Sequence, residues 1–238
     1  MKASYAHYTL IFRQPAGTSR GVLTDKETYF LKLEDEDMPG VFGLGECAVF
    51  RGLSADDVPA YEDKLRELCA NISADKETDL HEFPSIRFGL ETAINDFANG
   101  CRRQPFPSDF TEGMSAIPIN GLVWMGTKEE MLRRIDDKIK AGFTTIKLKV
   151  GAIDTESELD LVRHIRKVFP PEVLTIRLDA NGGFTPDNAL RKLSDFARYG
   201  IHSIEQPIKQ GQWEAMRRIC SESPIDIALD EELIGIHT

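Results

Sequence analysis

The sequence predicts an α/β protein in which an N-terminal α+β domain precedes a (β/α) barrel that ends after about five strands. Three observations carry this prediction. Residues 1–50 consist mainly of strand-like segments. From Ile117 onward, strand-like and helix-like segments alternate with a repeat of roughly 25 to 30 residues, the size of a βα unit. The length of 238 residues leaves room for two modest domains, which we place at 1–112 and 113–238.

The composition argues against several classes of partner. The chain carries 39 acidic and 29 basic side chains, giving a formal net charge of −10, and has no block of lysine and arginine. We therefore expect neither a nucleic acid nor an anionic membrane as a partner. No apolar stretch approaches the ~20 residues that span a bilayer, and the N-terminus lacks the apolar core of an export signal, so we expect a cytoplasmic protein. The four cysteines are scattered without a C-x-x-C pair, which predicts reduced thiols.

The first domain is predicted to contain an antiparallel meander followed by two helices. Strands are expected over 5–13, 28–34 and 41–50, with turns at Gly17, Gly21 and residues 38–40. The sequence from Ser54 to Asp57 resembles a helix start, and apolar residues at helical spacing follow it. A second helix is expected around residues 86–97.

The second domain is predicted to alternate strictly between strands and helices. Its five expected strands are 117–124, 144–150, 174–183, 202–208 and 225–232. Capping boxes at Thr127–Glu130 and Thr155–Glu158 predict the first two helix starts, and Thr185 with Pro186 predicts the third. A fourth helix is expected around Trp213.

Short loops between alternating elements imply a parallel sheet, either doubly wound or closed into a barrel. A doubly wound nucleotide-binding sheet should have a G-x-G-x-x-G turn after its first strand, but the sequence there is GLVWMGTKEE. The barrel is therefore favoured. Because a complete barrel typically needs ~250 residues, we expect this chain to stop part-way through one.

Charged residues occupy the C-terminal ends of four successive strands. They are Lys147 and Lys149, Asp179, Glu205 and Asp230. Barrel active sites are built at that end. Three carboxylates brought together there repel one another unless a cation holds them, and all-oxygen ligands favour Mg²⁺ or Mn²⁺ over zinc. Each acidic residue alone would equally fit a helix cap or a solvent-facing position.

Lys147 and Lys149, taken alone, are best explained as solvated residues at the end of a strand, with no catalytic role. Beside a bound cation and another lysine, however, the ammonium form is disfavoured, which lowers a lysine pKa from ~10.4 toward the ~7 to 8 of a useful general base. Lys149 would then be the base and Lys147 the neighbour that tunes it.

Several motifs together resemble the enolase superfamily, specifically its muconate-lactonizing-enzyme-like subgroup. They are Lys147-Leu148-Lys149, Asp179-Ala180-Asn181, Glu205-Gln206-Pro207, Asp230-Glu231 and Gly43-Leu44-Gly45-Glu46. Within the subgroup, four further segments look most like the o-succinylbenzoate synthase family. They are residues 19–21, 45–54, 84–93 and 117–126.

The resemblance implies a fold, a reaction and roles for particular residues. Asp179, Glu205 and Asp230 would bind Mg²⁺, with Mn²⁺ as a substitute, and the ion would hold the substrate carboxylate. Lys149 would remove the proton α to that carboxylate, beside Lys147. The implied reaction is the dehydration of 2-succinyl-6-hydroxy-2,4-cyclohexadiene-1-carboxylate to o-succinylbenzoate in menaquinone biosynthesis, through a metal-stabilised ene-diolate of the kind that this superfamily uses.

The first domain resembles the capping domain of the superfamily. Its loops over residues 16–21 and 48–54 would close over the substrate. Arg20 and Arg51 would meet the succinyl carboxylate, although surface arginines are the commoner explanation. Asn181 is a further expected substrate-binding residue.

The superfamily places a second catalytic lysine at the end of the sixth strand, a position beyond this chain. We therefore expect the 238 residues alone to be poorly active. Two alternatives stay open: a racemase or epimerase of N-acylamino acids or dipeptides, and a non-catalytic remnant that binds a partner. The expected partner is a small carboxylate, and the oligomeric state is left open.

Overall fold

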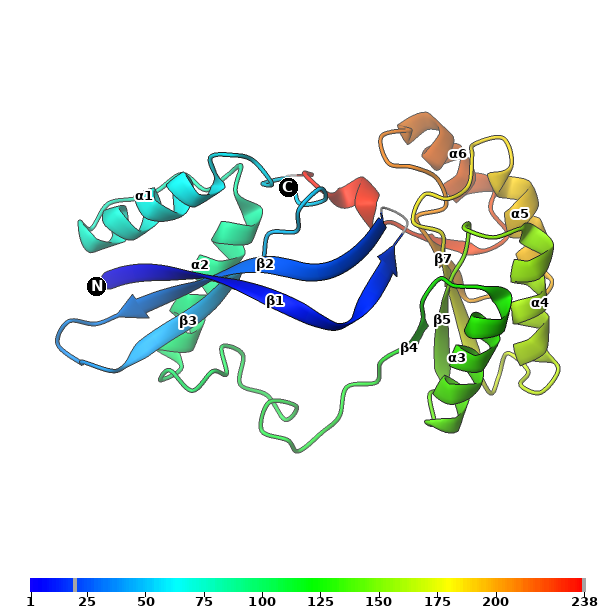
Figure 1. The fold of residues 1–238 in the computed structure, drawn as a ribbon, viewed down its shortest axis with the longest axis horizontal. Coiled ribbons are helices and arrows are strands. Elements are labelled where there is room, and N and C mark those ends of the chain that lie inside the picture. Colours follow the sequence, from blue (N-terminus) through cyan, green and yellow to red (C-terminus); the bar gives the residue numbers. More distant parts are fainter. Residues whose placement is uncertain (19–20, 237–238) are drawn as a thin grey trace. The chain divides into compact units, whose positions relative to one another are not determined.

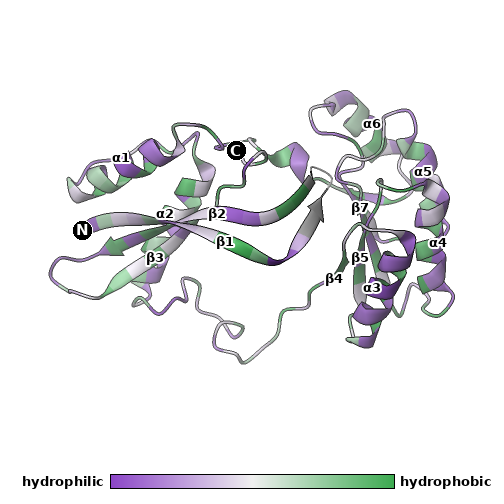
Figure 2. Ribbon diagram, in the orientation of Figure 1, coloured by the Kyte–Doolittle hydropathy of each residue, from purple (hydrophilic) through white to green (hydrophobic). Residues whose placement is uncertain are grey.

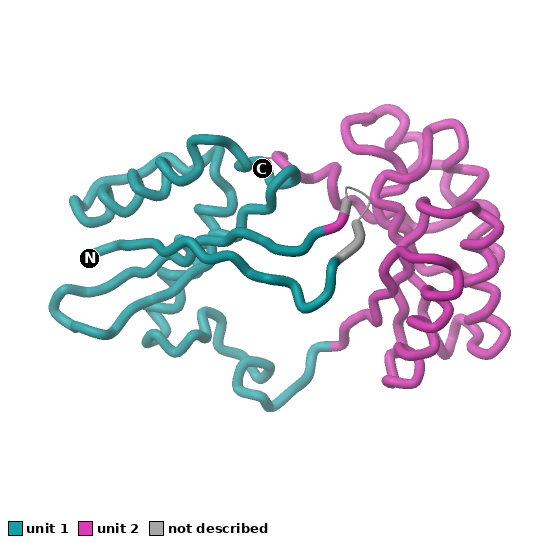
Figure 3. Tube along the Cα trace, in the orientation of Figure 1, with its two compact units in different colours: residues 1–15, 23–117, 237 teal, residues 16–22, 118–236, 238 magenta. Residues whose placement is uncertain are grey.

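The computed structural model describes residues 1–18 and 21–236, and the side chains of residues 1–15 and 22–236. The chain divides into two compact units (Figure 3). In the described range, unit 1 comprises residues 1–15 and 23–117, and unit 2 comprises residues 16–22 and 118–236. The domain boundary expected at residues 112 and 113 stays a prediction.

Unit 1 contains a three-stranded sheet and two helices (Figure 1). The sheet has the order β1-β2-β3, and β2 pairs with β3 in antiparallel register. The elements are β1 (Lys2–Thr18), β2 (Gly21–Glu34), β3 (Phe42–Cys47), α1 (Tyr61–Ser73) and α2 (Pro84–Ala98). Buried side chains from β2 and both helices form the core, including Leu31, Tyr61, Leu65 and Ile86. Gly17 and Gly21, which we predicted as turn residues, lie within β1 and β2.

The predicted helix start at Ser54 to Asp57 was wrong, because those acidic side chains bind elsewhere. Asp56 is fully buried, and its Oδ2 accepts hydrogen bonds from the Ser85 backbone N–H at 2.8 Å and from Ser85 Oγ at 2.6 Å. Asp57 accepts from the Gly52 N–H at 2.7 Å. The chain therefore turns through this segment, and α1 begins at Tyr61.

Close backbone packing between β3 and α2 depends on glycine. A Cβ atom placed on Gly45 would overlap the backbone carbonyl of Gly89 in α2, and one on Gly43 would overlap the carbonyl of Ala93. The missing side chains let the helix backbone lie directly against the strand. The Gly43-Leu44-Gly45-Glu46 motif therefore has a packing role.

Unit 2 alternates strand and helix throughout, as predicted. Its elements are β4 (Gly121–Val123), α3 (Lys128–Lys140), β5 (Thr145–Lys149), α4 (Thr155–Arg166), β6 (Thr175–Asp179), α5 (Ala189–Ala197), β7 (Ser203–Glu205), α6 (Trp213–Glu222), β8 (Asp226–Ala228) and the 3₁₀ turn η1 (Glu231–Leu233). The five strands pair in parallel in the order β4-β5-β6-β7-β8. This sequential parallel order confirms the predicted (β/α)-barrel fold class over five strands.

Side chains alternate along these strands between an apolar face and a polar face. On β5, Ile146 and Leu148 are fully buried in a core shared with α3 and α4, whereas Lys147 and Lys149 point to the other face. Right-handed crossovers in sequential order place all the helices on one side of such a sheet. Figure 1 shows α3 and α4 on one side of β5, and Figure 2 shows the hydrophobic residues of the strands. The charged face is therefore free for chemistry.

Helix starts in unit 2 follow the predictions in part. The capping box of Thr127 with Glu130 is confirmed. The second predicted box was wrong, because Asp154 caps α4 by accepting from the Ser157 N–H at 2.9 Å. The third start was also wrong: Asn188 Oδ1 accepts the Thr185 N–H at 3.0 Å, and α5 begins at Ala189. Among the helices that the structure describes, none is both long and apolar enough to cross a membrane.

The glycine packing of unit 1 leads to a stability prediction. We expect Gly45→Ala to lower the free energy of unfolding by about 1–3 kcal/mol, because the added methyl group meets a helix carbonyl that cannot turn aside. Urea unfolding measures this change. The matched control is Gly126→Ala, whose Cβ would meet only the flexible ends of Glu130 and Arg134, with an expected effect within about 0.5 kcal/mol. Equal losses in the two variants would contradict the prediction.

Candidate active site

The carboxyl ends of β5, β6 and β7 bring opposite charges into contact. The strand register aligns Lys149 with Asp179 and Asp179 with Glu205. Lys147 lies on the same face, two residues before Lys149, and its Nζ is 2.7 Å from Glu205 Oε2 and 3.0 Å from Asp179 Oδ2. One ammonium group therefore bridges the carboxylates of two neighbouring strands.

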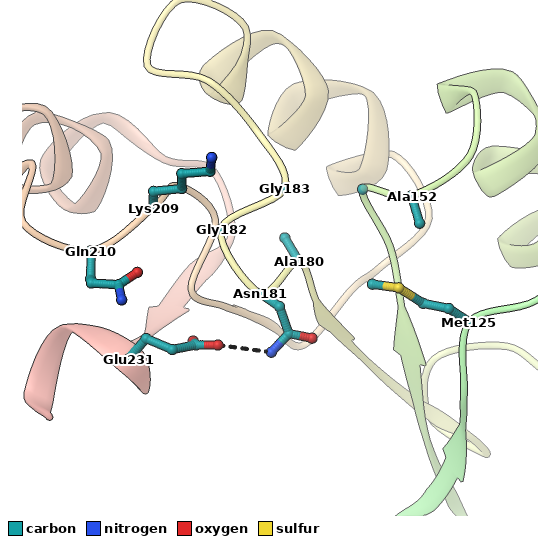
Figure 4. Close-up of a pocket in the computed structure, with 10 residues that line it drawn as sticks. Met125, Ala152, Ala180, Asn181, Gly182, Gly183, Lys209, Gln210 and Glu231 are labelled. Carbon is teal, nitrogen blue, oxygen red and sulfur yellow. Dashed lines mark hydrogen bonds between the residues drawn. The ribbon is translucent and has the colours of Figure 1, made fainter. Parts of the chain in front are cut away.

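The predicted base, Lys149, is held by two oxygen atoms from the β6 end. Its Nζ donates to Asp179 Oδ2 at 2.7 Å and to Asn181 Oδ1 at 2.5 Å. Asn181 has a positive φ of 43°, which turns the chain sharply after the strand. Its amide Nδ2 donates to Glu231 Oε1 at 3.1 Å, so Asn181 links the β5 lysine to the segment after β8 (Figure 4).

The electrostatics of this cluster follow from burial and from the lysines. Burial alone raises the pKa of Asp179, but the hydrogen bonds and charges of Lys149 and Lys147 more than offset it, so the pKa lies below its usual value. Burial lowers the pKa of Lys147, yet Glu205 and Asp179 raise it further, so Lys147 is an ammonium ion. A charged Lys147 therefore lies two residues from Lys149 on the same strand, and its role in tuning that base stays a prediction.

Two other carboxyl groups have raised pKa values. For Glu205, burial and the nearby Asp179 raise the pKa against the opposing effect of Lys147. For Asp230, burial raises the pKa, and the charges of Glu231 and Asp179 add to it. The negative charges at this edge of the sheet are therefore close enough to repel one another, which is the condition in which a cation binds.

The described residues nevertheless contain no group of three His, Cys, Asp or Glu side chains arranged around one point as a metal site. Asp179 and Glu205 converge on Lys147, whereas Asp230 lies two residues beyond the end of β8, where the residue as a whole is exposed although its carboxyl group is partly desolvated. The donor set still fits a hard divalent cation, because all three residues offer carboxylate oxygens at neighbouring strand ends and repel one another there. The three-ligand site stays a prediction.

Of the two predicted substrate arginines, the structure describes the side chain of Arg51. Arg51 lies in unit 1, where its Nε is 2.8 Å from Glu27 Oε2 and its Nη1 is 2.7 Å from Asp57 Oδ1. These two carboxylates raise its pKa further and occupy its guanidinium group. The side chain of Arg20 lies outside the described residues. Substrate contact by either arginine stays a prediction.

A cavity of about 410 Å³ lies at the same end of the sheet, beside Asn181 (Figure 4). Its lining comes from the segments that follow all five strands, and includes Met125, Asn181, Lys209, Gln210 and Glu231. A cavity at this edge, next to the lysine and carboxylate cluster, has the position and size of a binding site for a small molecule.

Sequence reasoning missed two buried acidic residues. Glu231 was seen only as part of the Asp230-Glu231 motif, although it contacts Asn181. Glu158 was expected in a capping box, but it is buried and accepts the Gly151 N–H at 2.5 Å, which fixes the loop after β5. Burial raises the pKa of Glu158. The capping pattern gave no signal that this side chain folds back onto the preceding loop.

Comparison with known proteins identifies the family. A family model described as enolase C-terminal domain-like matches residues 130–238. An o-succinylbenzoate synthase from Desulfotalea psychrophila is 40% identical over 270 residues, which cover 99% of this chain and 73% of that protein. The chain belongs to the o-succinylbenzoate synthase family of the enolase superfamily. The resemblance predicted from the motifs is confirmed, and with it the enzyme class, a lyase.

Solved structures agree with this membership. The crystal structure of MenC from Desulfotalea psychrophila superimposes with a TM-score of 0.85 at 36% identity, covering 100% of this chain and 73% of that chain. An o-succinylbenzoate synthase from Thermosynechococcus elongatus, solved with Mg in its active site, gives a TM-score of 0.79 at 28% identity, with coverage of 97% and 69%. The superfamily fold therefore holds over essentially the whole chain.

The raised pKa of Asp230 leads to a prediction about stability and pH. A carboxyl group whose pKa is higher in the folded than in the unfolded chain destabilises the fold once pH rises above the unfolded value of ~3.9. In the presence of a chelator, Asp230→Asn should therefore unfold at a higher temperature than the unchanged chain at pH 7, and the difference should disappear near pH 4.

Thermal unfolding followed by circular dichroism measures this difference across the pH range. Asp226→Asn is the matched control, because Asp226 is an exposed residue at the opposite end of β8. An Asp230→Asn variant that is less stable than the unchanged chain at pH 7 would contradict the prediction.

Proposed function

We propose that this protein catalyses the Mg²⁺-dependent dehydration of 2-succinyl-6-hydroxy-2,4-cyclohexadiene-1-carboxylate to o-succinylbenzoate. The observation that supports it most is the position of Lys149, whose amine lies beside a strand-end carboxylate and a cavity in a chain 40% identical to such a synthase. We also propose a small carboxylate as the partner and the cytoplasm as the location.

The metal would be held by Asp179, Glu205 and Asp230. When bound, a divalent cation supplies positive charge that offsets the negative charge developing on the substrate carboxylate as the α-proton leaves. Lys147 bridges Asp179 and Glu205, so its ammonium group holds both carboxylates in place. Asp179 and Glu205 would hold such a cation with the same oxygens that now accept from Lys147.

Lys149 would move the proton. The ammonium form of a lysine has three N–H bonds, and two of the three positions on Nζ are directed at Asp179 and Asn181. The third position is left for the substrate. As the neutral amine, Nζ would take the proton from the carbon α to the carboxylate, and the electron pair of that C–H bond would be delocalised onto the carboxylate oxygens.

The second half of the reaction can use the same nitrogen. The C–O bond at the neighbouring carbon breaks as that electron pair returns to form the third ring double bond, and the leaving hydroxide takes the proton from the Lys149 ammonium to form water. The ring becomes aromatic, which drives the elimination. The same lysine can therefore serve both proton transfers when the proton and the hydroxyl group leave from the same face of the ring.

The 40% identity to an o-succinylbenzoate synthase supports dehydration over the racemase alternative. A racemase needs bases on opposite faces of the substrate carbon, and Lys147 and Lys149, which share one face of β5, would supply the base on one side only. The non-catalytic alternative is less well supported, because a fold without chemical demands gains little from placing two lysines around a buried carboxylate.

The metal site is tested by calorimetry with Mg²⁺ and Mn²⁺. Asp179→Asn, Glu205→Gln and Asp230→Asn should each weaken binding at least tenfold, since replacing even a supporting residue of a metal site typically costs about 10- to 100-fold. Asp226→Asn should bind as the unchanged protein does. Equal affinities in all five proteins would overturn this assignment.

The base is tested by the formation of o-succinylbenzoate, followed by ultraviolet absorbance in the whole protein at saturating Mg²⁺. Lys149→Ala should lower turnover by about 10² to 10⁴ while leaving metal affinity largely intact, because the lysine transfers a proton and is not a metal ligand. The exposed Lys167→Ala serves as the control.

Near-normal turnover in Lys149→Ala would remove this residue from the mechanism. An unchanged protein that leaves the cyclohexadiene carboxylate intact, but exchanges the α-proton of N-succinylamino acids, would move the function to the racemase.

A further inference from the structure

Gln206 follows Glu205 directly and has an unusual backbone and an unusual environment. Its side chain is fully buried, and its φ of 40° lies in the left-handed region that residues other than glycine rarely adopt. Such a conformation costs of order 1–3 kcal/mol and persists only where surrounding contacts enforce it. Here the Gln206 carbonyl accepts the Gly182 N–H at 2.7 Å, and the side chain of Gln206 adds further contacts.

The side-chain amide uses its full hydrogen-bonding capacity. Its Oε1 accepts the backbone N–H of Asp230 at 3.2 Å and that of Glu232 at 3.1 Å. Its Nε2 donates to the Ile208 carbonyl at 3.0 Å and to Glu232 Oε2 at 3.1 Å. Two acceptor and two donor bonds are all that a glutamine amide can make at ordinary geometry.

Glu232 completes the link between the two loops. Its side chain is buried, with 2% of the residue exposed, and its Oε1 accepts the Gly211 N–H at 2.8 Å. The loop after β7 and the loop after β8 are therefore joined by two side chains that contact each other. We call Gln206 and Glu232 the loop staple.

The loop staple acts where the backbone ladder stops. The paired residues of β7 and β8 end at Glu205 and Ala228, with one more bond from the Gln206 N–H to the Ala228 carbonyl at 2.9 Å. Beyond that point the sheet no longer fixes the path of residues 229–232. The Gln206 amide takes over by holding the N–H groups on either side of Glu231.

We propose that Gln206 and Glu232 are positioning residues, which hold the backbone of Asp230 so that its carboxylate completes a divalent-metal site with Asp179 and Glu205. The inference rests on the proposed function. Neither residue needs to touch the metal or the substrate. Gln206 is covalently next to one proposed ligand and hydrogen-bonded to the backbone of another, so its geometry sets the relation between the two.

Reversing the two side chains tests this role. Gln206→Glu places two carboxyl groups together and removes both donor bonds, whereas Glu232→Gln removes one acceptor. In the double variant Gln206→Glu with Glu232→Gln, an amide and a carboxyl group again face each other in the opposite order. The measurements are Mn²⁺ affinity by calorimetry, and thermal unfolding in chelator to establish that each variant is folded.

Each single variant should bind Mn²⁺ about 10- to 100-fold more weakly than the unchanged chain. In the double variant, the increase in the logarithm of the Mn²⁺ dissociation constant should be at most half of that in the single variants. The controls are Gln14→Glu and Glu222→Gln, which make the same changes at exposed positions and should bind normally. A merely structural staple would lower the unfolding temperature and leave Mn²⁺ affinity in the folded protein unchanged.

Three results would overturn the positioning role. Normal Mn²⁺ affinity in the folded single variants would overturn it directly. If Gln206→Glu does not fold, normal Mn²⁺ affinity in the milder variant Glu232→Gln would overturn it instead. A double variant that binds no better than the weaker single variant would also do so. An unchanged chain that binds no Mn²⁺ would overturn the proposed metal site as well, which distinguishes that failure from loss of the staple alone.

Discussion

Asp179 carries a negative charge inside the protein, and the carboxyl edge of the sheet is organised around that charge. Its side chain is completely buried, and a buried carboxylate is stable only among cations and N–H donors. Lys147 and Lys149 supply two ammonium groups, and the Asn181 N–H donates to Oδ1 at 3.0 Å. The same contacts that stabilise the charge hold both lysines in one orientation, so the proposed base is in place before a substrate arrives.

The two-residue period of the strands allows this charge to be buried without damaging the core. Ile176 and Leu178 of β6 pack with the helices, while Arg177 and Asp179 extend to the opposite face. Packing and chemistry therefore use different faces of the same strands. Gathering the carboxylates on one face lowers the stability of the fold. The pKa values of Glu205 and Asp230, which burial and neighbouring charges raise, show that their ionised forms are destabilised there. Carboxylates that repel one another favour a cation, and they disfavour the metal-free fold.

The sequence predicted the strands and the residues at their ends well, because these follow from periodicity. It predicted helix starts poorly where a side chain binds a different segment of the chain. Positions at the C-terminal ends of successive strands were enough to group Lys147, Lys149, Asp179 and Glu205, and the structure brings these four residues into contact. The helix starts at Ser54 and Thr155 failed for another reason. The acidic side chains that resembled helix caps accept hydrogen bonds from other segments. Asp56 binds Ser85, 29 residues along the chain, and Glu158 binds the loop before its own helix. No local pattern encodes such contacts.

The end of the β7 and β8 ladder shows why a parallel sheet places its chemistry where it does. Backbone hydrogen bonds fix each strand as far as its last paired residue, and past that point the chain turns toward the next helix. A functional residue beyond the ladder gains freedom to approach a ligand but loses the backbone constraint. At Asp230 the Gln206 amide replaces that constraint with two hydrogen bonds to backbone N–H groups. The Gln206 side chain therefore decides how accurately the last carboxylate of the edge is placed, although it carries no charge and performs no step of the reaction.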